Sequence, residues 1–186
     1  MSNLGPDISK PSGLTAVLQR HGIGLSKSMG QHFLIDKNHL GKIVAAAGIQ
    51  PTDHILEIGP GAGVMTRLLS VEASKVFTIE LDHRMIGVLD ETLADLENVT
   101  VVQGDALSVD WGIAFSDDNT TRLVANIPYQ ITSPLLIRIL ESDPSFTHAT
   151  ILVQKEVAER VVAPAGSKVY GALSCVAQFV CDCHIS

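Results

Sequence analysis

The chain of 186 residues is long enough for one domain with a sizeable core, and its 46% hydrophobic content fits a globular α/β protein. The net charge of −7 argues against a uniformly basic surface, and three cysteines clustered near the end argue against a disulfide framework. No apolar run reaches the roughly 18 residues of a membrane helix, and the N-terminus has no signal-peptide pattern. We therefore expect a cytoplasmic protein that does not enter a membrane.

The N-terminal part differs in composition from the rest. Residues 1–42 contain five Lys or Arg against two Asp, so this part is basic whereas the body that follows is acidic. Gly, Pro and Ser are frequent in residues 1–12. We predict a flexible basic arm over residues 1–24 and a single domain over residues 25–186.

Beyond the arm, the hydrophobic pattern predicts alternating strands and helices. A helix should begin after Asp36 and end at Gly48. Short β-branched runs then predict strands at residues 54–58, 75–81, 98–105, 122–126 and 150–155, with amphipathic helices after the first, second and fourth. This alternation is typical of an α/β fold with a mostly parallel sheet and helices on both faces.

Glycines and polar residues gather where the predicted strands end. The loop LEIGPGAG, residues 56–63, places Gly59, Gly61 and Gly63 between the first strand and its helix, where the backbone can approach a ligand closely. A dinucleotide fingerprint would need its third glycine at Val64, and a P-loop would need Lys-Ser/Thr after the glycines. Neither phosphate-binding motif is present.

Two acidic residues at further strand ends suggest which ligand binds. Glu80 lies at the end of the second strand and could accept hydrogen bonds from ribose hydroxyls, although a solvated acid is the alternative. Asp105 ends the third strand and could accept from an adenine amino group, or cap a turn. With the glycine loop, these residues indicate adenosine without a phosphate chain, and S-adenosylmethionine is the common cofactor of that kind.

The tetrapeptide NIPY after the fourth strand resembles the motif of the adenine-N6 methyltransferases, and this resemblance implies an adenine amine as the target. The amide oxygen of Asn126 and the carbonyl of Ile127 can each accept one hydrogen of an adenine amine, which directs its lone pair at the methyl donor. Pro128 fixes the backbone, and Tyr129 offers a ring for the base to stack on. The target adenosine must lie outside any base stack, which fits an RNA loop or an extruded base.

In finer detail, the chain is similar to the rRNA adenine N6,N6-dimethyltransferase family of the KsgA type. Four further stretches carry the resemblance: KSMGQHFL (27–34), LEIGPGAG (56–63), IELD (79–82) and LVQKEVAERVVAPAGSKVYGALS (152–174). The resemblance implies a Rossmann-like S-adenosylmethionine-dependent methyltransferase that dimethylates adenosines of small-subunit rRNA during ribosome biogenesis.

The resemblance also implies roles for further residues. His32 and Leu34 belong to the segment that closes over the cofactor, and His32 stands where the family often has Asn. The cofactor set is then His32, Leu34, Gly59, Gly61, Gly63, Glu80, Asp105 and Asn126. We expect no metal site, because the CDCH sequence at residues 181–184 lacks a second ligand pair.

The family has more chain than this sequence. Its members continue with two further strands and a helical C-terminal domain, so we expect an incomplete sheet, no such domain, and a chain that ends as it enters a sixth strand. We expect a monomer that binds rRNA. The alternatives are a large-subunit rRNA adenine methyltransferase that confers antibiotic resistance, or a non-catalytic cofactor-binding assembly or transcription factor.

Overall fold

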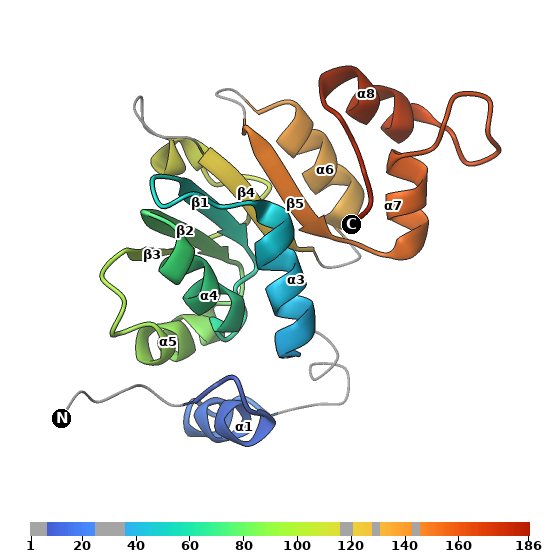
Figure 1. The fold of residues 1–186 in the computed structure, drawn as a ribbon. Coiled ribbons are helices and arrows are strands. Elements are labelled where there is room, and N and C mark those ends of the chain that lie inside the picture. Colours follow the sequence, from blue (N-terminus) through green and yellow to red (C-terminus); the bar gives the residue numbers. More distant parts are fainter. Residues whose placement is uncertain (1–6, 25–35, 116–120, 128–130, 143–145) are drawn as a thin grey trace.

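The fold is built around one parallel sheet. The computed structural model describes residues 7–24, 36–115, 121–127, 131–142 and 146–186. The five strands are β1 (His54–Ile58), β2 (Lys75–Glu80), β3 (Val99–Gln103), β4 (Thr121–Asn126) and β5 (His148–Leu152). They pair in parallel in the order β3-β2-β1-β4-β5, which confirms the predicted parallel sheet (Figure 1). The order reverses between β1 and β4, the place where such sheets bind ligands.

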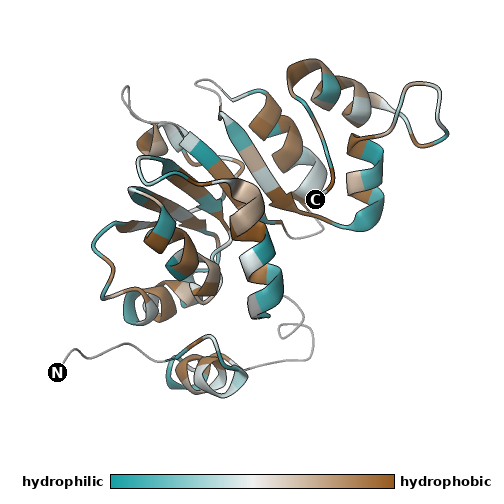
Figure 2. Cartoon of the chain, in the orientation of Figure 1, coloured by the Kyte–Doolittle hydropathy of each residue, from teal (hydrophilic) through white to brown (hydrophobic). Residues whose placement is uncertain are grey.

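Helices cover both faces of the sheet, as predicted. On one face lie α3 (Lys37–Ala47), α4 (Val64–Glu72) and α5 (His83–Thr92), and on the other lie the 3-10 helix η1 (Trp111–Ala114) and α6 (Thr132–Leu140) (Figure 1). Successive residues of a strand point to opposite faces, so Ile55 packs in the α4 cluster and Leu56 packs in the α6 cluster. Figure 2 shows that these helices combine apolar (brown) and polar (teal) residues.

Local capping chemistry sets the bounds of α3. The Asp36 carboxylate accepts hydrogen bonds from the backbone N–H groups of Asn38 and His39, which satisfies two free donors of the first turn. Gly48 ends the helix in the left-handed region, with φ of 57°. The predicted helix from Asp36 to Gly48 is therefore confirmed.

The structure differs from the expected flexible arm at residues 11–20. Here Pro11–Arg20 form helix α1, and its residues Leu14, Val17 and Leu18 are buried in the same apolar cluster as α4 and α5. At its C-terminal end, Arg20 and the C-cap residue His21 both contact the carboxylate of Glu91 on α5. Leu14, Val17 and Leu18 have the spacing of an amphipathic helix, but the Gly, Pro and Ser residues before them favoured a flexible segment. The helix is stable because its apolar side is buried against α5.

The C-terminal part also differs from the expectation. The fifth strand was predicted over residues 150–155, but it ends at Leu152. Lys155–Val161 then form helix α7, and Ala172–Val180 form α8. The side-chain amide of Gln178 donates to the carbonyls of Val161 and Ala163, which holds α8 against the end of α7. The expected entry into a sixth strand is wrong, since residues 181–186 are described without a strand.

Within the described residues, no helix combines the length and the apolar character needed to cross a membrane.

Candidate functional site

The glycine loop lies at the carboxyl end of the sheet, next to the ends of β2 and β4. The N–H of Gly59 donates to the carbonyl of Ile79 at 3.0 Å, and the N–H of Gly61 donates to the Glu80 carboxylate at 3.3 Å. A Cβ atom at Gly59 would lie 3.6 Å from the backbone carbonyl oxygen of Asn126. The structure therefore brings together the loop, Glu80 and Asn126, which lie far apart in the sequence.

Backbone conformation explains the glycines of this loop. Gly59, Gly61 and Gly63 have φ values of 76°, 57° and 84°, all in the left-handed region that other residues adopt only with strain. Gly63 is also the N-cap of α4, and a Cβ there would lie 2.8 Å from the side chain of Leu93. The loop thus presents backbone, without side chains at these three positions, in front of the N-terminus of α4.

Glu80 is held in place by the loop and by the start of α5. The carboxylate is 8% exposed; its Oε2 accepts from the N–H of Gly61, and its Oε1 accepts from the N–H of Asp82 at 2.8 Å. Burial raises the pKa of Glu80, while the two backbone N–H groups oppose that rise. These bonds fix the direction of both oxygens and leave each with a lone pair for a ligand hydroxyl.

A second carboxylate, Glu57, lies beneath the loop. Glu57 is in β1 beside Thr78 of β2 and is fully buried; its Oε2 accepts from the hydroxyl of Thr66 on α4 at 2.7 Å. Its Oε1 has no hydrogen-bond partner among the described residues. Burial and, as a smaller effect, the charge of Glu80 raise the pKa of Glu57 to about 7, and the hydroxyls of Thr66 and Thr78 oppose that rise. The sequence pattern predicted no role for Glu57.

Replacement of Glu57 by glutamine should remove a pH dependence of stability. Below pH 4.5 the carboxyl is protonated in both the folded and the unfolded state, whereas between pH 4.5 and about 7 only the folded state keeps the proton. The free energy of unfolding therefore falls by roughly 3 kcal/mol as the pH rises through this window. Urea unfolding at pH 5 and pH 8 should show a smaller fall for Glu57→Gln than for the wild-type protein; the fall that remains comes from other groups such as Glu80, whose pKa burial also raises.

The matched control is Glu72→Gln, which removes a carboxylate from the exposed end of α4. This variant should keep the pH dependence of the wild-type protein. A wild-type free energy of unfolding that does not fall between pH 5 and pH 8 would contradict the assignment of a neutral Glu57 in the folded state.

Asp105 and Asn126 complete the described part of the site. Asp105 is exposed after β3; its Oδ1 accepts from the N–H of Leu107 at 2.8 Å, and no partner of Oδ2 occurs among the described residues. Asn126 ends β4 and lies two residues after Val124, which packs in the α4 cluster, so it shares the face of the glycine loop. Ile127, which follows, is 7% exposed, and its N–H donates to the carbonyl of Leu152.

These residues fit an adenosine-bearing cofactor of the expected kind. Glu80 presents two oriented acceptor oxygens, Asp105 presents a further carboxylate oxygen, and the three glycines leave room for close approach of the ligand to the backbone. The other predicted site residues, His32, Leu34, Pro128 and Tyr129, lie outside the described residues. Among those that are described, no group of three or more His, Cys, Asp and Glu could hold a metal ion.

Comparisons with known proteins agree with this geometry. Residues 24–185 match the family described as "Ribosomal RNA adenine dimethylase". The chain is 45% identical over 184 residues to "Ribosomal RNA small subunit methyltransferase A" of Shouchella clausii, covering 97% of this chain and 62% of the relative. It is 44% identical over 177 residues to the protein of the same name from Lactiplantibacillus plantarum, covering 93% of this chain and 60% of that relative. The chain thus spans less than two thirds of the length of both relatives.

Two solved structures have a similar fold. A dimethyladenosine transferase from Plasmodium falciparum superposes with a TM-score of 0.70 at 36% identity, over 79% of this chain and 52% of that one. The 23S rRNA methyltransferase ErmE superposes with a TM-score of 0.64 at 33% identity, over 72% of this chain and 52% of that one. Both similarities support the methyltransferase fold expected from the sequence.

Proposed function

Because the chain belongs to the ribosomal RNA adenine dimethylase family, we propose that it dimethylates the N6 amine of adenosines in small-subunit rRNA, using S-adenosylmethionine. The observation that carries the proposal is the buried Glu80 carboxylate, bonded to the N–H of Gly61 where the strand order reverses. Two oriented carboxylate oxygens at this place suit the two hydroxyls of a ribose. The relatives named small-subunit methyltransferases support the choice of substrate.

The cofactor would be held by the described residues at the ends of β1, β2 and β3. Glu80 would accept from the ribose hydroxyls, and Asp105 would accept from the adenine amino group. The glycine loop from Gly59 to Gly63 would pass beside the ligand without a steric conflict. When bound, S-adenosylmethionine supplies an electrophilic methyl group on a positively charged sulfur.

The target amine would be held at the end of β4. An adenine amine is a weak nucleophile because its lone pair is delocalised into the ring. The side-chain oxygen of Asn126 and the carbonyl oxygen of Ile127 would each accept one of its hydrogens, and this directs the lone pair out of the ring plane. Positioning and electrostatics then account for most of the rate, and the proton of the product can leave to solvent without a strong base.

The domain boundaries, partner and location form part of the same proposal. The family match begins at residue 24, which supports a cofactor-binding domain over residues 25–186. The RNA partner would be the small ribosomal subunit or its precursor, bound by a monomer in the cytoplasm. Tyr129, His32 and Leu34 keep their proposed roles in base stacking and in closing the cofactor site.

Mass spectrometry of rRNA from cells with and without the gene tests this function. We expect dimethyladenosine to disappear from small-subunit rRNA of the deletion strain and to return when the gene is restored. Loss from large-subunit rRNA would instead support the alternative methyltransferase, which the similarity to ErmE keeps as the second candidate. Unchanged methylation of both rRNAs would contradict the enzymatic proposal and favour a non-catalytic assembly factor.

A further inference from the structure

The loop that carries Asp105 is a tight turn between β3 and η1. At its start, the N–H of Gly104 donates to the backbone carbonyl of Glu80 at 2.9 Å, which ties the loop to the cofactor side of β2. The carbonyl of Asp105 accepts from the N–H of Val109 at 2.9 Å. A Cβ at Gly104 would lie 2.2 Å from the side chain of Val109, so the loop folds back closely on itself.

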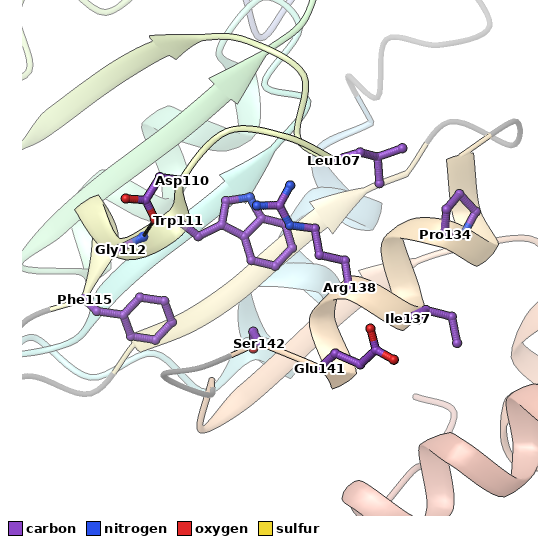
Figure 3. A pocket seen from close by; sticks show the side chains of 10 residues that line it. All are labelled: Leu107, Asp110, Trp111, Gly112, Phe115, Pro134, Ile137, Arg138, Glu141 and Ser142. Atoms are coloured by element: carbon purple, nitrogen blue, oxygen red, sulfur yellow. Dashed lines mark hydrogen bonds between the residues drawn. The ribbon is translucent and has the colours of Figure 1, made fainter.

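The side chain of Arg138, from helix α6, forms hydrogen bonds with the backbone of this loop. Arg138 of α6 is half-buried and donates from Nη1 to the carbonyl of Ala106 at 2.6 Å and from Nη2 to the carbonyl of Val109 at 2.5 Å. Its guanidinium also lies 4.2 Å from the ring centroid of Trp111. Figure 3 shows this stacked pair on the wall of a hollow of about 500 Å³ between η1 and α6.

In the described part of the chain, no carboxylate lies within ion-pair distance of Arg138, so its polar contacts are the two carbonyls of this loop and the ring of Trp111. A half-buried arginine that bonds to two backbone carbonyls in the turn after Asp105 restrains that loop more than a single contact would. The helix that carries Arg138 follows the segment beginning at Asn126. The guanidinium therefore links the loop at the end of β3 to the helix after the end of β4.

We propose that Arg138 is a positioning residue, which holds the 104–109 loop so that the Asp105 carboxylate faces the adenine of the cofactor. This inference rests on the proposed function, because it assumes that adenosine binds at Asp105. Arg138 itself does not touch the reacting atoms; it acts through Ala106 and Val109. Lysine cannot replace it, since an ammonium lacks the planar fork that reaches two carbonyls while stacking on an indole.

Calorimetric titration of the 186-residue chain with S-adenosylmethionine tests the proposal. We expect Arg138→Met to bind on the order of 10-fold more weakly than the wild-type chain, as fits the loss of charge-assisted bonds that orient a ligand group. Arg138→Lys should also bind more weakly, and being a milder change it provides a folded variant. The melting temperature of each variant is measured in parallel.

The matched control is Arg122→Met. Arg122 is also a half-buried arginine that donates to a backbone carbonyl, that of Ala47 at 3.0 Å, but it pairs with Asp53 at the opposite edge of the sheet. This variant should lose thermal stability and keep its cofactor affinity within about twofold. The comparison separates a loss of general stability from a loss of positioning.

A double-mutant cycle with Asp105→Ala gives a readout that a purely structural role would not move. In the wild-type background Asp105→Ala should weaken binding, whereas in the Arg138→Met background the additional loss should be less than about twofold, because the carboxylate is no longer held in place. Additive losses, or an Arg138→Met variant that binds as tightly as Arg122→Met, would overturn the inference alone. A wild-type chain that binds no S-adenosylmethionine would overturn the proposed cofactor and this inference with it.

Discussion

Replacement of Asn126 by alanine is expected to lower the rate of methyl transfer by about 10³-fold, because in the proposed mechanism this side chain would direct the lone pair of the target amine. Asn126 ends β4, and its backbone carbonyl oxygen lies next to Gly59 of the glycine loop. The target amine would therefore meet the cofactor there. Cofactor affinity should change by less than about fivefold, since Glu80 and Asp105 would hold the adenosine part. Turnover is measured with small subunits from the deletion strain, and affinity is measured by calorimetry.

Asn98→Ala is the matched control for this variant. Asn98 precedes β3, and its side-chain amide donates to the carbonyls of Ser70 and Ala73, away from the site. Its loss should lower stability and leave turnover per folded molecule close to that of the wild-type protein. Full turnover by Asn126→Ala would remove this residue from the mechanism.

Replacement of Glu80 by alanine is expected to weaken S-adenosylmethionine binding by about 100-fold, because it would remove the charge-assisted bonds proposed between this carboxylate and two ribose hydroxyls. The variant also leaves the N–H groups of Gly61 and Asp82 without the carboxylate that they now contact. Glu80→Gln keeps one acceptor oxygen, so its loss should be smaller, on the order of 10-fold. Calorimetric titration at neutral pH measures both affinities.

Glu97→Ala removes an exposed carboxylate before β3 and serves as the control, with unchanged affinity. Equal binding by the wild-type and the Glu80→Ala proteins would show that the ribose is held elsewhere. The two variants at Asn126 and Glu80 should therefore divide the site into a part that binds the cofactor and a part that activates the target.

Much of the fold was predictable because its signals are local. The β-branched run at residues 54–58 forms β1 with the predicted bounds, and Asp36 and Gly48 cap α3 where their side chains and backbone preferences indicate. Helix α1 was not predicted, because its stability depends on burial against α5, which lies some 70 residues further along the chain.

The grouping of Gly59, Glu80 and Asn126 was also predictable in outline. Parallel strands end at the same edge of a sheet, so residues that follow successive strands meet without any knowledge of side-chain packing. The motif around Asn126 then indicated the chemistry expected at that edge. What the pattern did not predict was which of the polar strand-end residues face solvent, as Asp105 does, and which are enclosed.

The sequence by itself determined the order of the candidate site residues along the chain. A glycine loop, two acidic residues and an amide each lie at the end of a strand that local preferences predict. Only the tertiary structure decided that Glu57 is fully buried, which raises its pKa to about 7. The same is true of the hydrogen bonds from Arg138 to the loop that carries Asp105. The physical reason is the same in both cases. Burial and long-range hydrogen bonds depend on which segments pack together, and residues such as Thr66 or Ala106 carry no sign of these partners in the sequence.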